Sequence, residues 1–533
     1  MEREHTSVWI IEATGKIGCL SKVLSSLGYV AEIIATRGHF CKMPDSLSDV
    51  AIDKNFHETD RIPDPVIVER IRTSIKIMLQ NGGNEVYIAT DDDAEGNVIA
   101  YDVFETIKDI FPNPKRVKLT ALDKDSIMEA LSTSGEVLKS EAIPGRTRAI
   151  IDRLIGASFA SHGLAAGRVG SAILGIIAKD KPKPYRLDLY ADALDGGRPW
   201  RASTELNNLI TKDIAEQLTH IVFPPLDYAE VKRKIIPPND MGRILVRAGD
   251  TMNLSPKDAA KALQAAYESG SLSYPRAASR GMSKAASLKL SKSLKQTGWK
   301  FDKSCIPDRT EGEPHDSPYP IGPVDVSLDP KKIGPGEGIR VMVARDLVPC
   351  GEKRRVEKHK KGIIDNFLIQ KGFSKEVSDF IDNLDWERDF GQPVPGESEN
   401  KQSQLVQRRI DSVILESCLK HDIGKPSTWP NHIQNFIDKG LVDENLDITQ
   451  LGQEFINRTP AILMNPVFSQ AIMKACDMTL SSSNGEPWEA LAKKIVNALP
   501  GNIKDKMNSV TVESTSDPAL EAEKAKILKD FGV

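Results

Sequence analysis

The sequence predicts a multi-domain protein of the α/β plus α class, with an additional β-rich region. The chain has 533 residues, which exceeds what one hydrophobic core usually holds and suggests about three or four domains. Residues 7–130 alternate short β-branched runs with amphipathic stretches, a pattern typical of a parallel sheet covered by helices. Residues 146–178 and the chain from about residue 410 onward have helical periodicity, whereas 186–250 and 326–404 are loosely patterned.

Composition and charge exclude several classes of protein. The 40% hydrophobic and 27% charged residues are typical of a globular protein in water. The net charge of −4 excludes DNA binding by overall charge, so such binding requires local basic patches. No apolar run reaches membrane-spanning length, and a strand-like segment at 8–11 directly follows the N-terminus, so we expect neither membrane segment nor signal peptide. The scattered cysteines, without a Cys-x-x-Cys pair, predict no zinc ribbon, no disulfide framework and a cytoplasmic setting.

The first predicted strand, 8–11, ends at a carboxylate. Glu12 follows it, and Gly15 and Lys16 lead into an amphipathic helix that Gly28 ends. This stretch superficially resembles half of a P-loop. It lacks the first glycine, and Ile17 stands where Ser or Thr should follow the lysine. We therefore expect no ATP binding here.

A cluster of acidic residues follows the strand predicted at 86–89. Asp91, Asp93 and Glu95 occupy alternate positions there, and a helix follows them. Ligands bind at the carboxyl ends of strands in open α/β sheets, and Glu12 ends another strand. So many carboxylates repel one another unless a cation neutralises them, and carboxylate oxygens suit Mg²⁺. The pattern favours a magnesium site made by Asp91, Asp93, Glu95 and Glu12.

Two other interpretations of the acidic segment stay open. A calcium loop would also match its first positions, with Asp102 at the twelfth, although such a loop should follow a helix rather than a strand. A solvated acidic turn without metal is the second alternative.

A predicted helix precedes the segment that carries the candidate nucleophile. Ser255 and Pro256 start this helix, and Gly270 ends it. Its apolar face is formed by Ala259, Leu263, Ala266 and Tyr267.

The segment after this helix carries Tyr274, Pro275 and Arg276. The proline biases the segment toward extended geometry, in which residues i and i+2 project to one side. We therefore expect Tyr274 and Arg276 to point the same way, with the cation favouring the phenolate of a nucleophilic tyrosine. An ordinary surface turn is the alternative.

Basic residues are grouped in three places. The helical stretch 146–178 contains Arg146, Arg148, Arg153 and Arg168, a helix from Ser283 carries several lysines, and 353–361 is the densest basic patch. The arginines could bind phosphates, although ion pairs and solvated faces are their commoner use. The lysine helix could equally be a phosphate-binding face or a solvated one.

Separated segments of the chain resemble, in the same order, the type IA DNA topoisomerases. They are 10–16 (IIEATGK), 38–44 (GHFCKMP), 90–96 (TDDDAEG), 152–156 (DRLIG), 166–169 (AGRV), 273–276 (SYPR), 315–316 (HD) and 424–428 (GKPST). Segment 90–96 is similar to the family's Toprim motif Asp-x-Asp-x-Glu-Gly. The sequence departs from the family's pattern at Ala94, Gly170, Ala277 and Ala278, which suggests a divergent member.

The resemblance implies ATP-independent cleavage of one DNA strand, strand passage and religation, with relaxation of negatively supercoiled DNA. Tyr274 would become joined to the 5′ phosphate, while Arg276 and Lys16 hold the phosphate oxygens. Glu12 would serve as general acid and base. Mg²⁺ would position the broken end. The residues implied to contact DNA are His39, Arg148, Arg153, Arg168 and His315.

The resemblance also implies a toroid with four parts. These are a Toprim domain (1–135), a helical DNA-binding base (136–185 and 405–533), a hinged arch (186–250 and 325–404) and a tyrosine domain (251–324). We expect a monomer that acts on single-stranded or underwound DNA, in a prokaryotic cytoplasm or encoded by a phage or mobile element. A Toprim-type magnesium-dependent nuclease or primase, which would not need Tyr274, and a catalytically weak DNA-binding relative remain open alternatives.

Overall fold

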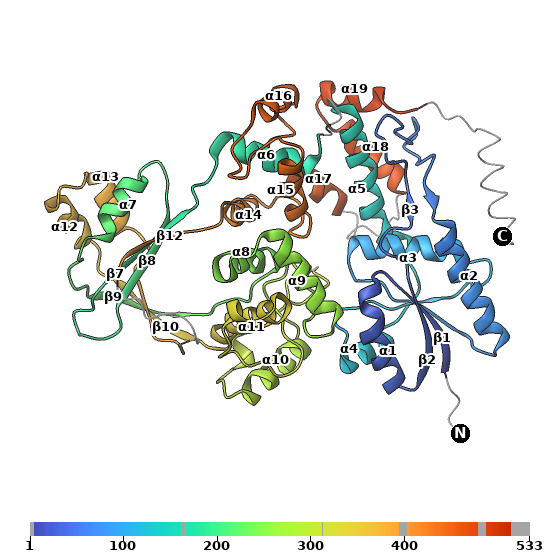
Figure 1. Ribbon diagram of the computed structural model, residues 1–533, viewed down its shortest axis with the longest axis horizontal. Coiled ribbons are helices and arrows are strands. Elements are labelled where there is room, and N and C mark those ends of the chain that lie inside the picture. Colours follow the sequence, from blue (N-terminus) through green and yellow to red (C-terminus); the bar gives the residue numbers. More distant parts are fainter. Residues whose placement is uncertain are drawn as a thin grey trace.

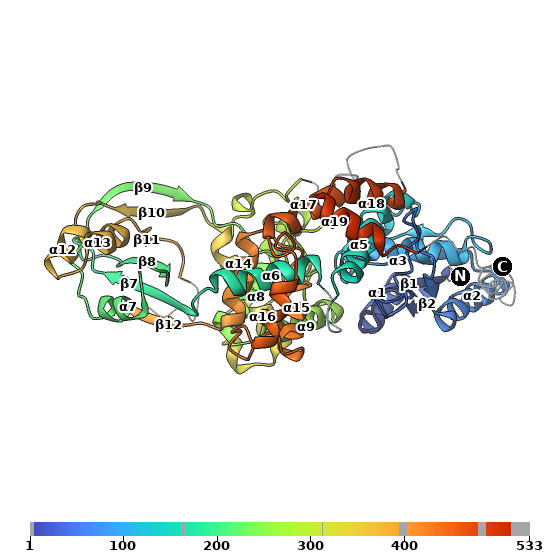
Figure 2. The same cartoon turned by 90° about the horizontal axis from the view of Figure 1, so that it is seen from above.

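The computed structural model describes residues 5–160, 164, 166–311, 313–393, 402–477 and 487–512. The molecule is elongated, with an N-terminal sheet at one end, a second sheet at the other and helices between them (Figures 1 and 2). Within the described residues, no helix combines the length and the hydropathy needed to cross a membrane.

The N-terminal domain is a parallel sheet covered by helices on both faces. Its strand order is β2-β1-β5-β6, and its strands are β1 (His5–Ile11), β2 (Tyr29–Ala35), β5 (Glu85–Ile88) and β6 (Lys115–Arg116). Its further elements are η1 (Thr14–Lys16), α1 (Ile17–Ser26), β3 (Cys41–Lys42), β4 (Ile62–Pro63), α2 (Pro65–Gln80), α3 (Ala94–Ile107) and α4 (Lys124–Ser132).

Successive side chains of β1 point to opposite faces of the sheet, and both faces are covered, so this domain has a helical layer on each side of the sheet. Val8 and Ile10 pack with residues of α2 and α3, whereas Trp9 and Ile11 pack on the other face with residues of α1 and α4. A strand that is buried on both faces reads as a continuous apolar run, which is the pattern that predicted it. Because β1 and β5 are neighbours and run parallel, their carboxyl ends lie at the same edge of the sheet.

The centre of the molecule is helical and shares one large hydrophobic core. Within it α9 packs against α8 and α11, and α8 packs against α14. The helices are α5 (Lys139–Ser158), α6 (Arg168–Asp180), α8 (Met241–Met252), α9 (Pro256–Glu268), α10 (Lys284–Gln296), η2 (Lys303–Cys305), η3 (Pro330–Lys332), α11 (Pro335–Leu347), η4 (Val348–Gly351), α14 (Ile410–Lys420), α15 (Trp429–Asp438), α16 (Gln450–Arg458), α17 (Pro466–Asp477), α18 (Trp488–Asn497) and α19 (Gly501–Ser509).

The second sheet is antiparallel, with strand order β12-β7-β8-β11-β10-β9, and has a hydrophobic core of its own. We call it the arch. Its elements are β7 (Tyr185–Ala191), β8 (Trp200–Glu205), α7 (Lys212–Thr219), β9 (Tyr228–Lys234), β10 (Arg354–His359), α12 (Ile364–Gln370), α13 (Lys375–Asp382), β11 (Glu387–Asp389) and β12 (Gln404–Gln407).

The predicted fold class is confirmed, and one detail of the expected arch differs. Helix α8 begins within the range 186–250 and helix α11 lies within 325–404, yet both contribute buried residues to the central core. Their apolar faces pack against α9. They therefore belong with the helices on either side of Tyr274, α9 and α10, which we call the tyrosine-bearing helices, rather than with the sheet. The loose sequence pattern marked the strands and did not separate them from the adjoining helices.

Candidate active site

The acidic segment is a rigid turn between β5 and α3. The Asp93 side chain caps α3 by accepting from the Gly96 N–H at 2.7 Å, and the Thr90 hydroxyl donates to the Gly96 carbonyl at 2.7 Å. A Cβ on Gly96 would lie 2.2 Å from the Asp91 carbonyl oxygen, so only glycine fits there. The buried Arg116 donates to the Thr90 and Asp91 carbonyls at 2.9 and 2.8 Å. The carboxylates are therefore held on a fixed frame.

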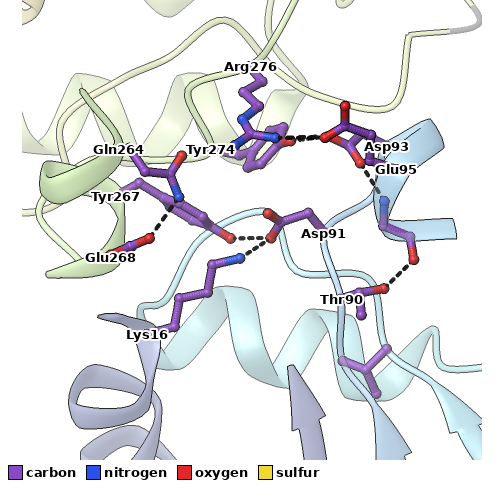
Figure 3. Close-up of polar contacts among 12 residues, drawn as sticks. Lys16, Thr90, Asp91, Asp93, Glu95, Gln264, Tyr267, Glu268, Tyr274 and Arg276 are labelled. Atoms are coloured by element: carbon purple, nitrogen blue, oxygen red, sulfur yellow. Dashed lines mark hydrogen bonds and ion pairs between the residues drawn. The ribbon is translucent and has the colours of Figure 1, made fainter. Parts of the chain in front are cut away.

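Tyr274 and Arg276 reach this turn from the helical centre (Figure 3). The Tyr274 hydroxyl donates to Asp93 Oδ2 at 2.5 Å, and the Tyr274 N–H donates to the Thr120 carbonyl at 2.8 Å. Arg276 Nη1 lies 3.3 Å from Glu95 Oε2 and 4.0 Å from Asp93 Oδ2. The structure thus places the two side chains on the same side, as the extended geometry predicted.

A second group of contacts surrounds Asp91. Lys16 is fully buried and forms an ion pair with Asp91 Oδ1. The Tyr267 hydroxyl donates to the same oxygen at 3.0 Å, and Lys16 Nζ lies 4.9 Å from the centre of the Tyr267 ring. Figure 3 shows Lys16 and Tyr267 converging on Asp91 from different elements. Sequence reasoning assigned Tyr267 to the apolar face of its helix and missed its hydroxyl.

Burial and charge set the protonation of Tyr274. Burial and the neighbouring Asp93 and Asp91 carboxylates raise the pKa of Tyr274 well above its usual value, and Arg276 opposes this only in part. Arg276 does favour the phenolate, as expected, but its effect on the pKa of Tyr274 is smaller than that of burial and two anions together. Tyr274 is held here as a protonated phenol.

Asp93 accepts the hydrogen bond from that phenol. Burial alone would raise the pKa of Asp93, but hydrogen bonds from the Gly96 N–H and the Tyr274 hydroxyl, with the charge of Arg276, bring it below its usual value. The phenol therefore faces a carboxylate that remains ionised at neutral pH. Asp93 is placed to accept the phenol proton by this contact, although its lowered pKa makes it a weak base.

Glu12 has the opposite electrostatic character. Burial, followed by the charge of Asp91, raises the pKa of Glu12 to about 8, although Lys16 lowers it in part. Its Oε2 atom is buried and has no hydrogen-bond partner among the residues that the structure describes. Glu12 is therefore mostly a neutral carboxylic acid at pH 7, and two neighbouring carboxylates, Glu12 and Asp93, have pKa values displaced in opposite directions.

His315 covers the other side of the tyrosine. Its ring centroid lies 4.1 Å from that of Tyr274 at an interplanar angle of 37°, and the residue is 3% exposed. Burial lowers the pKa of His315, so the ring is neutral near pH 7. Neither ring nitrogen makes a hydrogen bond of ordinary geometry within the described part of the chain.

The predicted metal ligands are engaged by protein groups in this arrangement. Asp91 pairs with Lys16, Asp93 accepts from Tyr274, and Glu95 pairs with Arg276. Across the described ranges, no group of three or more His, Cys, Asp or Glu residues is placed to hold a metal ion together. The chemistry of the donors fits a small divalent cation, because they are all carboxylates and Glu12 keeps one unpartnered oxygen. The magnesium site stays a prediction.

The calcium interpretation does not fit the structure. Its twelfth-position ligand, Asp102, is buried and forms ion pairs with Arg61 and Arg146. The acidic turn follows a strand, not a helix.

Three arginines expected to contact DNA are bound to protein groups. Arg148 pairs with Asp477 at 2.9 Å. Arg168, whose side chain is 2% exposed, donates to both carboxylate oxygens of Asp152 at 2.9 and 3.2 Å. Arg153 donates to backbone carbonyls, including that of Ser46 at 2.7 Å. The structure thus favours the alternative use of these residues in internal contacts, and a role toward DNA stays untested.

His39 lies on the N-terminal domain. It follows β2 and is exposed. Glu95 is among the charged groups near its ring.

A polar cavity of about 310 Å³ begins close to the active-site segment. Its lining includes Ala278, two residues beyond Arg276, and carries charges of both signs. The cations are Arg243, Lys425 and Lys474, and the carboxylates are Asp240, Glu313, Asp422 and Asp477. Ala278 is exposed, whereas Ala277 is buried and receives the Met241 N–H on its carbonyl at 3.0 Å. The alanine at 277 therefore contributes through its backbone.

The N-terminal part of the chain matches the Toprim domain over residues 7–122. A protein of Acanthamoeba polyphaga mimivirus, DNA topoisomerase 1 type prokaryotic, is 30% identical over 175 residues, which are 32% of this chain and 19% of that protein. DNA topoisomerase 1 of Fervidobacterium islandicum is 22% identical over 502 residues, which are 82% of this chain and 68% of that protein. The match thus spans only part of each relative.

The fold is also that of a solved topoisomerase. Full-length topoisomerase I from Thermotoga maritima superposes with a TM-score of 0.61 at 16% identity, covering 95% of this chain and 90% of the other. Together with the Toprim domain and the match over most of the chain, this confirms the resemblance to type IA topoisomerases.

Proposed function

We propose that this chain is an ATP-independent type IA DNA topoisomerase, which cuts one DNA strand, passes another through the break and reseals it. The observation that carries the proposal is the placement of Tyr274. Its hydroxyl lies 2.5 Å from Asp93 of the Toprim domain, with Arg276 beside it and Glu12 near the same turn. A Toprim domain alone would not need that tyrosine.

The cleavage step uses two protons. Tyr274 Oη attacks the phosphorus of a backbone phosphodiester, and the phenol proton passes to Asp93, its hydrogen-bond acceptor. The bond from phosphorus to the 3′ oxygen breaks, and Glu12 donates its proton to that leaving oxygen. A pKa of about 8 keeps this proton available at neutral pH. The products are a 5′-phosphotyrosyl bond and a free 3′ hydroxyl, and religation is the reverse.

Two cations lie where negative charge would develop. Arg276 has a partly exposed side chain above Asp93 and Glu95, so its guanidinium can bind an entering phosphate in two places. Lys16 is buried against Asp91 and sits beneath the same turn. Their charge stabilises the phosphate oxygens as the bond to Tyr274 forms.

Asp91, Asp93 and Glu95 of the acidic turn would hold Mg²⁺ together with Glu12, which follows β1. Bound there, the cation would neutralise these carboxylates and hold the broken end for resealing. The single unpartnered oxygen of Glu12 supports a cation at this place.

DNA is the proposed substrate, as a single-stranded or underwound segment, and the enzyme would act as a monomer that relaxes negative supercoils. Strand passage requires Tyr274 to leave the acidic turn while it carries the 5′ end.

One experiment separates this proposal from its rivals. Negatively supercoiled plasmid is incubated with the wild type and with Tyr274→Phe, with and without Mg²⁺, and the products are trapped with detergent and digested. Relaxation and a tyrosine-linked 5′ end, both lost in the variant, support the proposal. Nicking that survives the substitution points to a nuclease, and DNA binding without either activity points to an inactive relative.

A further inference from the structure

We propose that Tyr267 is a positioning residue that holds the Asp91 carboxylate from across the boundary between the Toprim domain and the tyrosine-bearing helices, and that its hydroxyl competes with a divalent cation for that carboxylate. The inference rests on the proposed function, because it assumes that α9 and Tyr274 move away from the acidic turn together during strand passage.

Tyr267 is as deeply inserted into the Toprim domain as the nucleophile itself. It lies on α9, is fully buried and donates to Asp91 Oδ1 at 3.0 Å. Its ring stands edge-on to that of Tyr274, at 5.4 Å between centroids and 84°. Both rings belong to the hydrophobic cluster that lies between the N-terminal sheet and helices α1 and α4. Within the described residues, Tyr267 and Tyr274 are the fully buried members of this cluster that come from outside the N-terminal domain.

The hydroxyl of Tyr267 can only act as a donor in this place. Its partner is a carboxylate oxygen, which only accepts, so the phenol supplies the proton of this hydrogen bond. Asp91 Oδ1 already accepts from Lys16, and the phenol is its second partner. A cation that binds through this oxygen must displace one of these donors.

The position of α9 makes this competition depend on conformation. When the tyrosine-bearing helices rest on the Toprim domain, Tyr267 occupies Asp91, and when they separate, the phenol is withdrawn. The affinity of Asp91 for a cation is therefore lower in the closed arrangement. By reciprocity, cation binding favours separation of the two parts.

Isothermal titration calorimetry with Mg²⁺, on the full chain without DNA, tests the proposal directly. Tyr267→Phe keeps the ring and removes the donor, and we expect it to bind Mg²⁺ about tenfold more tightly than the wild type, because a hydrogen bond to a charged group no longer competes. Tyr87→Phe is the matched control. Its ring stacks on Trp9 in the same buried cluster, and it should bind Mg²⁺ like the wild type.

A double substitution shows whether the effect passes through Asp91. In an Asp91→Asn background, Tyr267→Phe should no longer change Mg²⁺ affinity. Thermal unfolding of every variant is followed in parallel, so that a folding defect is recognised. Unchanged or weaker Mg²⁺ binding by a folded Tyr267→Phe protein overturns the proposal, as does a tenfold effect that persists in Asp91→Asn.

The proposed function is judged by a separate readout. Plasmid relaxation by the wild type, measured in the same preparation, shows whether the chain is a topoisomerase. A relaxing wild type with no difference in Mg²⁺ affinity refutes only the role of Tyr267. An affinity difference in a protein that neither cleaves nor relaxes DNA refutes the topoisomerase and supports the Asp91 contact alone.

Discussion

Charged side chains form two interfaces in this molecule, and the two differ in design. We call the interface between the tyrosine-bearing helices and the N-terminal domain the active-site joint, and the interface between the arch and the central helices the arch joint. At the active-site joint, protein donors from both sides meet the carboxylates of one turn: Tyr274 on Asp93, Arg276 on Glu95, and Tyr267 with Lys16 on Asp91. At the arch joint, one buried arginine gathers carboxylates from several elements. Arg408 binds Asp250 of α8 at 2.9 and 3.1 Å, Glu416 of α14 at 2.8 Å and Glu205 of β8 at 3.3 Å.

This difference indicates that a phosphate bound in the active site could open the active-site joint but not the arch joint. A phosphate entering the active site would take Arg276 and Tyr274 as partners, which removes the contacts that hold the joint closed. Arg408 is a permanent cation whose neighbouring carboxylates raise its pKa further, and its N–H also donates to the Pro184 carbonyl at 2.9 Å. The arch joint is therefore built to stay formed.

The largest effect is expected at Arg276. Arg276→Ala should lower the rate of DNA cleavage by about 10²–10³, because one preorganised contact to the developing charge is lost. Arg276→Lys keeps the positive charge but loses the paired N–H donors of the guanidinium. Its cleavage rate should lie between those of the wild type and Arg276→Ala. Trapped covalent complex on an end-labelled single strand measures the rate. A cleavage rate for Arg276→Ala within about threefold of the wild type would contradict the role given to this residue.

Glu12 gives the active-site joint a pH dependence in the metal-free protein. Its folded pKa of about 8 exceeds the reference value of 4.5, so its contribution to stability is fully present below pH 4.5 and is lost as pH rises through about 8. Glu12→Gln mimics the protonated form and should show no such loss. The melting temperature of the variant minus that of the wild type should therefore increase from pH 5 to pH 9. A constant difference across this range would mean that the Glu12 pKa is not raised.

Arg408→Met tests the arch joint. It leaves several partly buried carboxylates without their cation, and we expect the free energy of unfolding to fall by about 1–3 kcal/mol, since solvent reaches Glu205 and Glu416. Chemical denaturation measures this. Cleavage of a short single strand should stay near the wild-type rate, because Arg408 does not touch the site. Lys420→Met, which removes an exposed partner of Glu205, is the control and should cost less than about 0.5 kcal/mol.

The smallest effect is expected at the edge of the active-site joint. Lys289 of α10 reaches Asp123 at 3.0 Å and the Ser126 hydroxyl at 2.8 Å, at the start of α4. Lys289→Ala should destabilise the closed arrangement by less than about 1 kcal/mol, and the difference should shrink at high salt. Relaxation rates at two salt concentrations, compared with the exposed Lys292→Ala on the same helix, provide the measurement. Equal effects of the two substitutions would remove any role for this contact.

Sequence patterns predicted those parts of the site that depend on neighbouring residues in the chain. The apolar run 8–11 and the strand at 86–89 place Glu12 and the acidic turn at one sheet edge, and Pro275 sets the common direction of Tyr274 and Arg276. These features depend on backbone period and fixed dihedral angles, which a sequence displays directly.

The missed features depend on partners that are distant in the chain. Tyr267 satisfies the apolar period of α9 with its ring, while the hydroxyl at its tip meets a carboxylate of another domain. Arg116 lies on a two-residue strand that gives no pattern, yet it anchors the acidic turn. Whether Arg168 meets a phosphate or Asp152 also depends on packing, as does the direction of the Tyr274 pKa shift.

The pairing of the arch strands fixes when the arch can form during synthesis. Strands β7 and β8 pair with each other early, but β9 pairs with β10, which begins at Arg354, and β7 gains its outer neighbour only with β12. The helices that carry Tyr274 emerge from the ribosome before either partner does. Until then β9 is an unpaired edge, open to association with other chains. We therefore expect chains truncated after α11 to aggregate through this strand.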